Sequence, residues 1–370
     1  MHVAILCEYG SINGGENSLL AVLDHCPDDV RITVLAPAEG RFAEALATRQ
    51  LTHVPFSLLD ENSHRLPPFE AANRLMPVIE WLKPDLLHGN SLSTGRITGL
   101  LSQQMGQLCT AHLRDIIGLS KTAIHHLNSN RKLVAVSRAT RDFHLQQGLD
   151  PDRVEVLYNG VDCERFQPRP RDGRLRRERS LPEDSLIALT IGQIGMRKGL
   201  DVLVDAVTIN KDQLPEIHYV IVGERYSSKL ESIEYEQRLH RQIEEHGLTR
   251  HFHWLGYRDD IPELLNECDL LIHPARQEPL GRVILEAAAS GVSLIATTAG
   301  GTKEILDHTL AGILVTPGSV EHLTSALKYL PDRSGSRSTF EQEARKLACE
   351  RFDIRDRAAD LFAFWRSVAS

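Results

Sequence analysis

The sequence predicts an α/β protein with two doubly wound domains of similar size that face each other across a cleft. Three observations lead to this prediction. The chain of 370 residues is longer than one hydrophobic core normally serves. Short apolar runs alternate with amphipathic segments of helical length, which is typical of parallel strand–helix–strand units. This alternation stops near residue 165 and starts again near residue 185, which indicates a domain boundary.

The predicted strands are continuously apolar rather than alternating, which indicates that helices cover both faces of each sheet. In the first half they are VAILC (3–7), RITVLA (31–36), LTHVPF (51–56), DLLHG (85–89), LCTAH (108–112), KLVAVS (132–137) and VEVLY (154–158). In the second half they are LIALTIG (186–192), IHYVIVG (217–223), HFHWLG (251–256), LLIHP (270–274) and SLIATT (293–298). Amphipathic segments between them, such as 69–82, predict the helices.

An arginine-rich segment, residues 165–184, interrupts the alternation. It contains three prolines, seven arginines and no apolar periodicity. It therefore predicts a solvated linker between an N-terminal domain at 1–164 and a C-terminal domain at 185–352. Contact between these arginines and an anionic surface is the alternative interpretation.

The end of the sequence predicts a separate helix. Residues 351–370 read RFDIRDRAADLFAFWRSVAS, an amphipathic pattern without a break. Leu361, Phe362 and Trp365 must cover an apolar surface. We therefore assign 353–370 to a C-terminal element distinct from the second domain.

Composition narrows the class of protein. The formal net charge of −8 disfavours a nucleic-acid partner, because phosphate backbones bind basic surfaces. The six cysteines form no C-x-x-C pair, which favours reduced thiols over disulfides or a zinc site. The first residues, MHVAILCEYG, lack the basic start of a signal peptide, and no apolar run approaches about 18 residues. We expect a cytoplasmic protein, with peripheral contact at the inner face of a membrane as the open alternative.

The segment RQEPLGRVILEAAASG places two carboxylates, Glu278 and Glu286, eight residues apart on a loop and the helix that follows it. Pro279 and Gly281 lie near the helix start, where open backbone N–H groups and the helix dipole favour an anion. Eight helical residues span at most about 12 Å, comparable to the distance from a ribose to a sugar across a diphosphate. Either the two acids hold those groups or both are ordinary surface residues.

The segment TIGQIGMRKGLDVLVDA is a strand, a glycine-bearing loop and a helix. Gly192 and Gly195 allow a tight turn, and Arg197 and Lys198 follow at the helix start. Cations there oppose the helix dipole unless an anion is bound, and a diphosphate would suit both side chains. Two solvent-facing basic residues are the alternative. The segment lacks the G-x-x-x-x-G-K-[ST] pattern of a phosphate-binding loop.

Further glycine pairs follow strands at two other places. Gly300-Gly301 permits either close ligand approach or a tight turn. Gly14-Gly15 precedes the first helix but lacks G-x-G-x-x-G spacing, so no dinucleotide fingerprint is present. His112 ends a predicted strand, a position at which a lone histidine is more often structural than functional.

Taken together and in order, G-x-x-x-x-R-K-G, E-P-x-G-x-x-x-x-E and G-G-x-x-E resemble the motifs of the retaining glycosyltransferases of family 4, which have the GT-B fold. The resemblance covers nearly the whole chain and is strongest over 186–316. It implies two Rossmann-like domains, the second holding a nucleoside-diphosphate sugar and the first an acceptor. It also implies that the last helix crosses back to the first domain.

The resemblance assigns roles to individual residues. Arg197 and Lys198 match the diphosphate-binding pair, Glu286 the ribose-binding acid, Glu278 the acid that contacts the donor sugar, and His112 a histidine that orients that sugar. The other expected donor-site positions are Gly15, Leu280, Gly281 and Arg282 and, beyond these, Gly14, Gly192, Gly223, Tyr257 and Gly301. Three positions depart from the pattern. The family more often has Phe at Leu280, and an acid directly after the histidine, where this chain has Leu113. Its first glycine pair is often followed by a small residue and then Glu, where this chain has Glu16-Asn17.

The expected activity is retaining, front-face transfer of a hexose from the nucleotide sugar to a hydroxyl of a glycan or lipid-linked acceptor, of cell-envelope or exopolysaccharide type. We expect no cofactor and no metal requirement, because the Asp-x-Asp triplet at 150–152 precedes a strand and reads as a turn. A nucleotide-sugar epimerase of similar build is the alternative. The sequence does not identify the base, the sugar, the acceptor or the oligomeric state.

Overall fold

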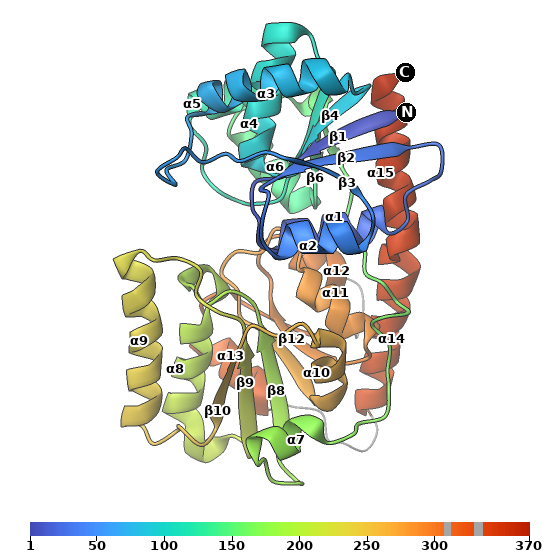
Figure 1. Ribbon diagram of the computed structural model, residues 1–370. Coiled ribbons are helices and arrows are strands. Elements are labelled where there is room, and N and C mark those ends of the chain that lie inside the picture. Colours follow the sequence, from blue (N-terminus) through green and yellow to red (C-terminus); the bar gives the residue numbers. More distant parts are fainter. Residues whose placement is uncertain (307–311, 329–335) are drawn as a thin grey trace. The chain divides into compact units, whose positions relative to one another are not determined.

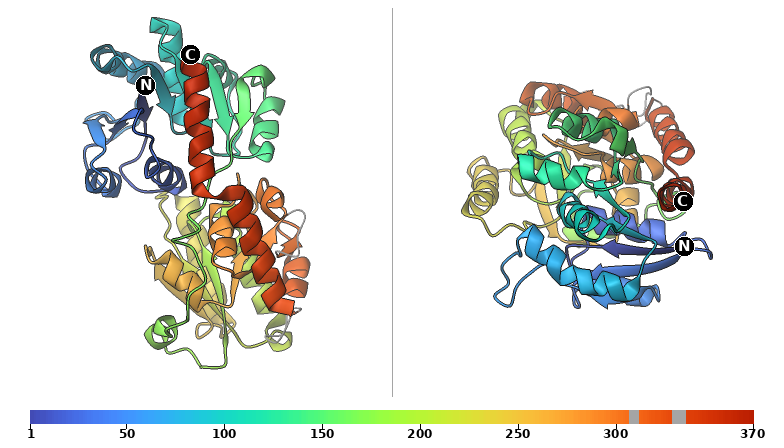
Figure 2. Two further views of the ribbon diagram at one scale, coloured as in Figure 1. Left: turned by 90° about the vertical axis from the view of Figure 1, so that its right-hand side faces the viewer. Right: turned by 90° about the horizontal axis from the view of Figure 1, so that it is seen from above.

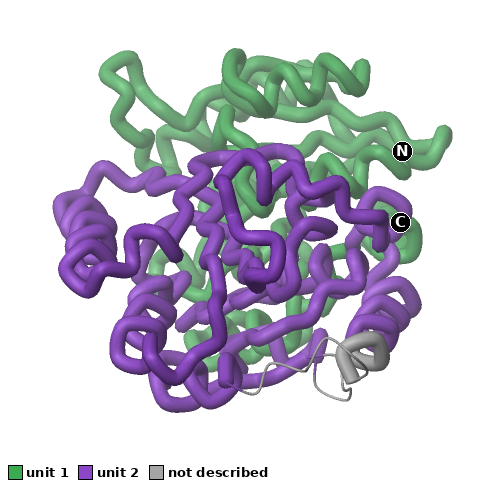
Figure 3. The backbone as a smooth tube through the Cα atoms, turned by 90° about the horizontal axis from the view of Figure 1, so that it is seen from below, with its two compact units in different colours: residues 1–160, 354–370 green, residues 161–353 purple. Residues whose placement is uncertain are grey.

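A computed structural model describes residues 1–306, 312–328 and 336–370 (Figure 1). The chain forms two compact units (Figure 3). Unit 1 comprises Met1–Gly160 together with Ile354–Ser370, and unit 2 comprises Val161–Asp353. Each unit contains one parallel sheet with helices packed against it, so the predicted α/β class with two doubly wound sheets is confirmed.

Unit 1 is built on a seven-stranded sheet in the order β3-β2-β1-β4-β5-β6-β7. The strands are β1 (His2–Leu6), β2 (Arg31–Ala36), β3 (Thr52–Pro55), β4 (Leu86–Gly89), β5 (Cys109–Leu113), β6 (Lys132–Ala135) and β7 (Val154–Val156). The helices are α1 (Gly14–Leu23), α2 (Arg41–Thr48), α3 (Pro68–Leu82), α4 (Leu92–Met105), α5 (Lys121–Asn128), α6 (Arg138–Gln146) and α15 (Ile354–Ala369). The strand order reverses between β1 and β4, which makes that point the topological switch of the sheet.

The last helix, α15, completes the core of unit 1 (Figure 2). Trp365 and Phe362 are fully buried in the cluster that contains Val3 and Ile5 of β1. This packing explains the apolar face of the C-terminal segment. The helical pattern is interrupted at Asp353, because α14 (Ser336–Phe352) ends there and α15 starts at Ile354. The prediction of one unbroken helix over 351–370 is therefore corrected.

Unit 2 repeats the same strand order with six strands, β10-β9-β8-β11-β12-β13. These are β8 (Leu186–Ile191), β9 (Ile217–Val222), β10 (Phe252–Gly256), β11 (Leu270–His273), β12 (Ser293–Thr297) and β13 (Ile313–Val315). The helices are α7 (Arg174–Arg179), α8 (Leu200–Asn210), α9 (Leu230–Glu245), α10 (Ile261–Glu267), α11 (Arg282–Ala289), α12 (Thr302–Leu306), α13 (Val320–Lys328) and α14. Its topological switch lies between β8 and β11.

The arginine-rich segment differs from the solvated linker expected at 165–184. It lies within unit 2, carries α7 and buries Leu175. Arg171 donates to Asp269 at 2.9 Å, and Arg174 pairs with Asp260. Several of its arginines therefore neutralise acids of unit 2.

Two further points concern the domain assignment. Of the predicted second domain, 185–352, residues 307–311 and 329–335 lie outside the described part of the chain. The chain passes from unit 1 to unit 2 after Gly160, four residues before the predicted end of the first domain. Among the described helices, none combines the length and hydropathy that a membrane crossing requires.

Candidate functional site

The switch point of unit 2 brings two predicted segments together. The loop after β8 runs through Gly192 to Gly199, and the loop after β11 runs from Pro274 to Gly281. Both leave the carboxyl ends of neighbouring strands, where doubly wound sheets bind their ligands. The backbone N–H of Arg276 donates to the carbonyl of Arg197 at 2.8 Å, so the two loops are joined directly.

The centre of this site is a buried triad of Lys198, Glu278 and His273. Nζ of Lys198 lies 2.6 Å from Oε2 of Glu278, and Nε2 of His273 lies 2.8 Å from the same oxygen. His273 and Glu278 are 2% and 7% exposed, so water screens these contacts weakly. The other carboxylate oxygen of Glu278, Oε1, is the one that neither partner contacts.

The triad has a defined protonation state. Burial by itself raises the pKa of Glu278, but the Lys198 ammonium and the hydrogen bond from His273 outweigh it and hold the pKa well below its usual range. Burial and Lys198 lower the pKa of His273. At neutral pH, Glu278 is therefore an anion and His273 a neutral ring that donates through Nε2, because a carboxylate can only accept.

Two glycines make this arrangement possible. Gly199 has φ +67°, and a Cβ at this position would lie 2.1 Å from the carbonyl oxygen of Pro274. Gly192 has φ +149°, and a Cβ at this position would only touch the methylenes of Lys198, at 3.4 Å or more, so the backbone angle is what requires glycine here. Any other residue would strain the backbone at either position.

Arg197 and the start of α11 form the more open part of the site. Arg197 is half-buried, and its Nη1 lies 3.5 Å from the carbonyl of Gln277. Gly281 precedes α11 with φ +111°, and no side chain caps the helix. The N-terminus of α11 therefore presents the positive end of its dipole beside two cations.

Glu286 is held by its own helix. Its Oε1 lies 2.7 Å from Nη2 of Arg282, one turn earlier, and the carboxylate is 5% exposed. Arg282 thus orients the acid predicted to bind ribose and leaves Oε2 as the other acceptor. Leu280 is buried at 2% exposure, so its side chain packs inside and its contribution to a ligand site is through the backbone.

The other glycines named from the sequence serve the backbone around the triad. The N–H of Gly301 donates to the carbonyl of Glu278 at 3.0 Å and so fixes that loop. The N–H of Gly223 donates to Gly256, and a Cβ on Gly223 would lie 2.0 Å from the carbonyl of Gly192. The backbone N–H of Tyr257 donates to Oε1 of Glu224 at 3.1 Å.

Unit 1 gathers its predicted residues at its own switch point. Gly15 lies in the first turn of α1, after β1, and Asn90 follows β4; the amide of Asn90 donates to the carbonyl of Gly15 at 3.3 Å. A Cβ on Gly15 would lie 3.2 Å from Cδ of Arg114, whereas one on Gly14 would meet nothing within 4 Å. Gly15 is therefore the more tightly packed glycine of this pair.

His112 lies at the same edge, on β5, and is held by a chain of hydrogen bonds. Nη2 of Arg114 lies 3.3 Å from its Nδ1, and Nε2 of His88 lies 2.9 Å from the same atom. Trp365 Nε1 lies 3.3 Å from Nδ1 of His88, which also lies 2.8 Å from the Thr110 hydroxyl.

The donors fix both tautomers. Arginine and tryptophan can only donate, so Nδ1 of His88 and Nδ1 of His112 are acceptors. His88 therefore donates through Nε2, and His112 carries its proton on Nε2. Burial lowers the pKa of both rings, with Arg114 acting in the same direction, to about 3 for His88. His112 is thus a neutral group that can donate through Nε2.

Several of these residues were not singled out from the sequence. His273, His88, Asn90 and Arg114 each contact a predicted residue. Trp365, which the sequence indicated only as an apolar cover, contacts His88. One signal was available: His273, Asn90 and Arg114 all lie at or just beyond the carboxyl end of a strand. The triplet at 150–152 lies in a turn, where Asp150 accepts from the N–H of Asp152 at 3.0 Å.

Comparison with known families covers most of the chain. The family model described as Glycosyl transferases group 1 matches residues 172–347. The model described as Glycosyltransferase Family 4 matches residues 12–165. The two matches correspond closely to the two sheets, and the first contains the triad and the Arg282–Glu286 pair.

Individual relatives agree with these matches. The chain is 24% identical over 270 residues to the lipopolysaccharide glucosyltransferase WaaG of Escherichia coli K12, an alignment that covers 70% of either protein. It is 31% identical over 211 residues to the D-inositol 3-phosphate glycosyltransferase of Salinispora arenicola, which covers 54% of this chain and 46% of that one. The crystal structure of Anabaena Alr3699/HepE in complex with UDP-glucose superposes with a TM-score of 0.85 at 25% identity, covering 98% of this chain and 99% of that chain.

Proposed function

The chain belongs to the family 4 glycosyltransferases, the group 1 enzymes with the GT-B fold, and from this membership we propose that it is a retaining, metal-independent hexosyltransferase. Its donor is a nucleoside-diphosphate sugar. The observation that carries the finer proposal is the buried Lys198–Glu278–His273 triad beside the uncapped start of α11. It combines cations for a diphosphate with an ionised acid for a sugar.

The leaving group is a diphosphate, on which negative charge develops as the glycosidic bond breaks. Glu278 uses one of the three N–H groups of Lys198, so the ammonium can still donate to phosphate oxygens. Arg197 supplies a second cation, and the amides around Leu280, Gly281 and Arg282 supply oriented dipoles. Groups aimed at developing charge contribute most to catalysis, and here they are positioned before the donor binds.

The sugar and ribose are assigned to the two glutamates. Oε1 of Glu278 accepts hydrogen bonds from sugar hydroxyls while Lys198 and His273 hold Oε2. Oε2 of Glu286 accepts from the ribose while Arg282 holds Oε1. Each acid is thus fixed through one oxygen and offers the other. His112 donates through Nε2 to the sugar and helps orient it.

Glu278 is assigned an orienting and electrostatic role rather than that of a nucleophile. Positive charge develops on the sugar in the transition state, and a buried anion stabilises it. Attack occurs from the face that the diphosphate leaves, and a departing phosphate oxygen accepts the proton of the acceptor hydroxyl. No metal takes part, because Arg197, Lys198 and the α11 amides neutralise the diphosphate; no cofactor is needed.

The acceptor is proposed to be a hydroxyl of a glycan or a lipid-linked saccharide. The names of two relatives support this class: one acts in lipopolysaccharide synthesis, and another is a galactosyltransferase for a diphosphoundecaprenol-linked GlcNAc. Such an acceptor would bring the enzyme to the inner face of a membrane as a peripheral protein. Unit 1, with His112 and Gly15 at its switch point, is the proposed acceptor side.

The first experiment is a donor screen. The purified chain is melted with UDP, GDP and ADP and with their glucose or mannose conjugates, beginning with UDP-glucose because the Anabaena structure holds it. A binding donor raises the melting temperature by mass action. The Lys198→Ala variant is expected to lose this rise, and Lys346→Ala, an exposed lysine on α14, to keep it. A full rise in Lys198→Ala would contradict the proposed diphosphate site.

A further inference from the structure

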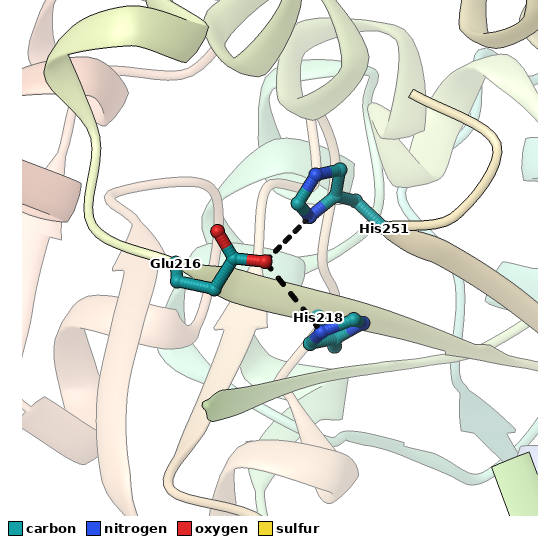
Figure 4. A group of neighbouring side chains, drawn as sticks. All are labelled: Glu216, His218 and His251. Atoms are coloured by element: carbon teal, nitrogen blue, oxygen red, sulfur yellow. Dashed lines mark ion pairs between the residues drawn. The ribbon is translucent and has the colours of Figure 1, made fainter. Parts of the chain in front are cut away.

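Three side chains at the amino ends of β9 and β10 form a cluster that the donor site does not use (Figure 4). Glu216 precedes β9, His218 lies on β9 and His251 precedes β10. One ligand atom from each lies within 4.8 Å of the other two. The strands are parallel, so this cluster lies at their amino ends, whereas the triad lies at the carboxyl ends of the strands of the same sheet.

His218 is the buried member of the cluster, at 6% exposure. Its Nε2 has no hydrogen-bond partner among the described residues and faces Oε1 of Glu216 at 4.0 Å. Its Nδ1 lies 2.9 Å from Nε2 of His253. When His218 donates through Nδ1, Nε2 holds a lone pair directed at the cluster. The reverse assignment would bury an N–H group without an acceptor, which is the more costly state.

We propose that Glu216, His218 and His251 form a binding site for a divalent transition metal of the zinc type. The ligand atoms are Nε2 of His218, Nδ1 of His251 and a carboxylate oxygen of Glu216, with solvent in a fourth position. Two imidazoles and one carboxylate are ligands that zinc accepts in tetrahedral geometry. The hydrogen bond from Nδ1 of His218 to His253 matches the second contact that metal-bound histidines usually make.

The cluster must contract to hold the ion. Ligand atoms around tetrahedral zinc are about 3.3 Å apart for bonds of about 2.0–2.1 Å. Oε1 of Glu216 lies 4.0 Å from Nε2 of His218 and 3.9 Å from Nδ1 of His251. The Glu216 side chain is 59% exposed, so it can close this gap by rotation.

His251 must also change its tautomer. Nε of Arg250 donates to its Nε2 at 3.1 Å, and Nδ1 faces the carbonyl of Ile217 at 3.3 Å. Binding at Nδ1 requires the proton on Nε2, so the exposed Arg250 side chain turns away. This change breaks two contacts of His251: the solvent-facing one with Arg250 and the longer one between Nδ1 and the carbonyl of Ile217.

The bound ion would join two neighbouring strands. β10 is one of the two edge strands of the sheet, and His251 immediately precedes it. A metal held by residues of both β9 and β10 stabilises the folded state, because these ligands are separate in the unfolded chain. The site is independent of the proposed transferase activity, which uses the opposite edge of the sheet.

The test is a zinc titration of the full, tag-free chain after treatment with EDTA. Calorimetry is expected to show one equivalent of Zn²⁺ bound with micromolar or tighter affinity, and zinc is expected to raise the melting temperature. Glu216→Gln should weaken binding at least tenfold, and His218→Gln should abolish it. His246→Gln, which removes an exposed histidine at the end of α9, serves as the control and should bind as the parent does.

Two results would overturn the proposal. One is the absence of saturable binding up to millimolar zinc. The other is unchanged affinity in Glu216→Gln. The exposed position of Glu216 also means that this variant should fold as the parent does and melt at the same temperature in EDTA, so a loss of affinity in it reports on the ligand itself. Should His218→Gln fail to fold, the Glu216→Gln comparison still decides the question.

Discussion

Trp365 on α15 donates a hydrogen bond from Nε1 to Nδ1 of His88 on β4, at 3.3 Å, across 277 residues of sequence. Because His88 in turn donates to Nδ1 of His112, the last helix acts together with Arg114, which donates to the same atom, to keep the proton of His112 on Nε2. The C-terminal segment thus contributes a polar contact to the neighbourhood of His112 in addition to its apolar packing.

Trp365→Phe removes this donor and keeps most of the ring. We expect kcat to fall about threefold to tenfold, which is the equivalent of losing one hydrogen bond of about 0.5–1.5 kcal/mol. The affinity for the donor identified in the screen above should change little. Steady-state kinetics and a donor titration measure the two effects separately. Trp81→Phe on α3, where the indole is 72% exposed, is the matched control. A kcat equal to that of the control would exclude the relay.

Glu278 and Glu286 are expected to affect different kinetic constants. Glu278→Gln removes a buried anion beside the reacting sugar, so kcat should fall by about 10²–10³. Glu286→Gln should raise the donor KM about threefold to tenfold and change kcat little, because the ribose is bound equally in the ground and transition states. Initial rates over a range of donor concentrations distinguish the two. Near-normal turnover in Glu278→Gln would refute its assigned role.

Sequence patterns predicted most of the strands because each is a short run of mainly apolar residues. The strands 31–36 and 186–192 were located to within one residue. β13 at Ile313–Val315 was missed, since three residues at the edge of a sheet carry little apolar signal. The break at Asp353 was also missed: it depends on Val161, which pairs with Asp353 from a distant part of the chain.

Site residues could be predicted where a single loop carries a recognisable motif. Contacts between residues of two different loops could not. Lys198 and Glu278 were each named, but the contact between them spans 80 residues and follows only from the adjacency of β8 and β11. His273 was taken as part of a strand because its partner depends on the loop that follows. The arginines of 165–184 looked solvated because their acidic partners, such as Asp269, lie far along the chain.

Stability should fall as the pH drops from 7 to 5. Burial lowers the folded-state pKa of His88 to about 3, while the unfolded value is near 6.5, so the unfolded chain binds a proton in this window that the folded chain does not. The stabilisation is present above pH 6.5 and is lost as the pH falls toward 3. His112 and His273, whose pKa values are also lowered, act in the same direction.

The pH prediction is tested by how steeply the free energy of unfolding changes with pH, and not by its value at any one pH. The free energy of unfolding is measured with guanidinium at pH 7, 6 and 5 and plotted against pH. The slope of this plot should be smaller in His88→Gln than in the parent, by up to about 1.4 kcal/mol per pH unit. His64→Gln, at a side chain that is 79% exposed, should keep the parental slope. Equal slopes in all three proteins would show that folding does not lower the pKa of His88.

The close approach of Gly199 to Pro274 gives the sharpest test of how the two loops of unit 2 are joined. Gly199 and Gly247 have nearly the same backbone angle, φ +67° and +68°, but a Cβ at 199 would lie 2.1 Å from the Pro274 carbonyl, whereas one at 247 would meet nothing within 4 Å. Gly247→Ala should therefore show only the cost of the left-handed conformation, about 1 kcal/mol. Gly199→Ala should lose clearly more stability, because the backbone at residue 199 or the backbone at Pro274 must move to relieve the clash.

Donor binding should weaken in Gly199→Ala alone, because Lys198 and the loop bearing Glu278 move with these atoms. Denaturant midpoints and donor titrations of the two variants measure both effects, and equal losses in the two would mean that the loops tolerate the displacement.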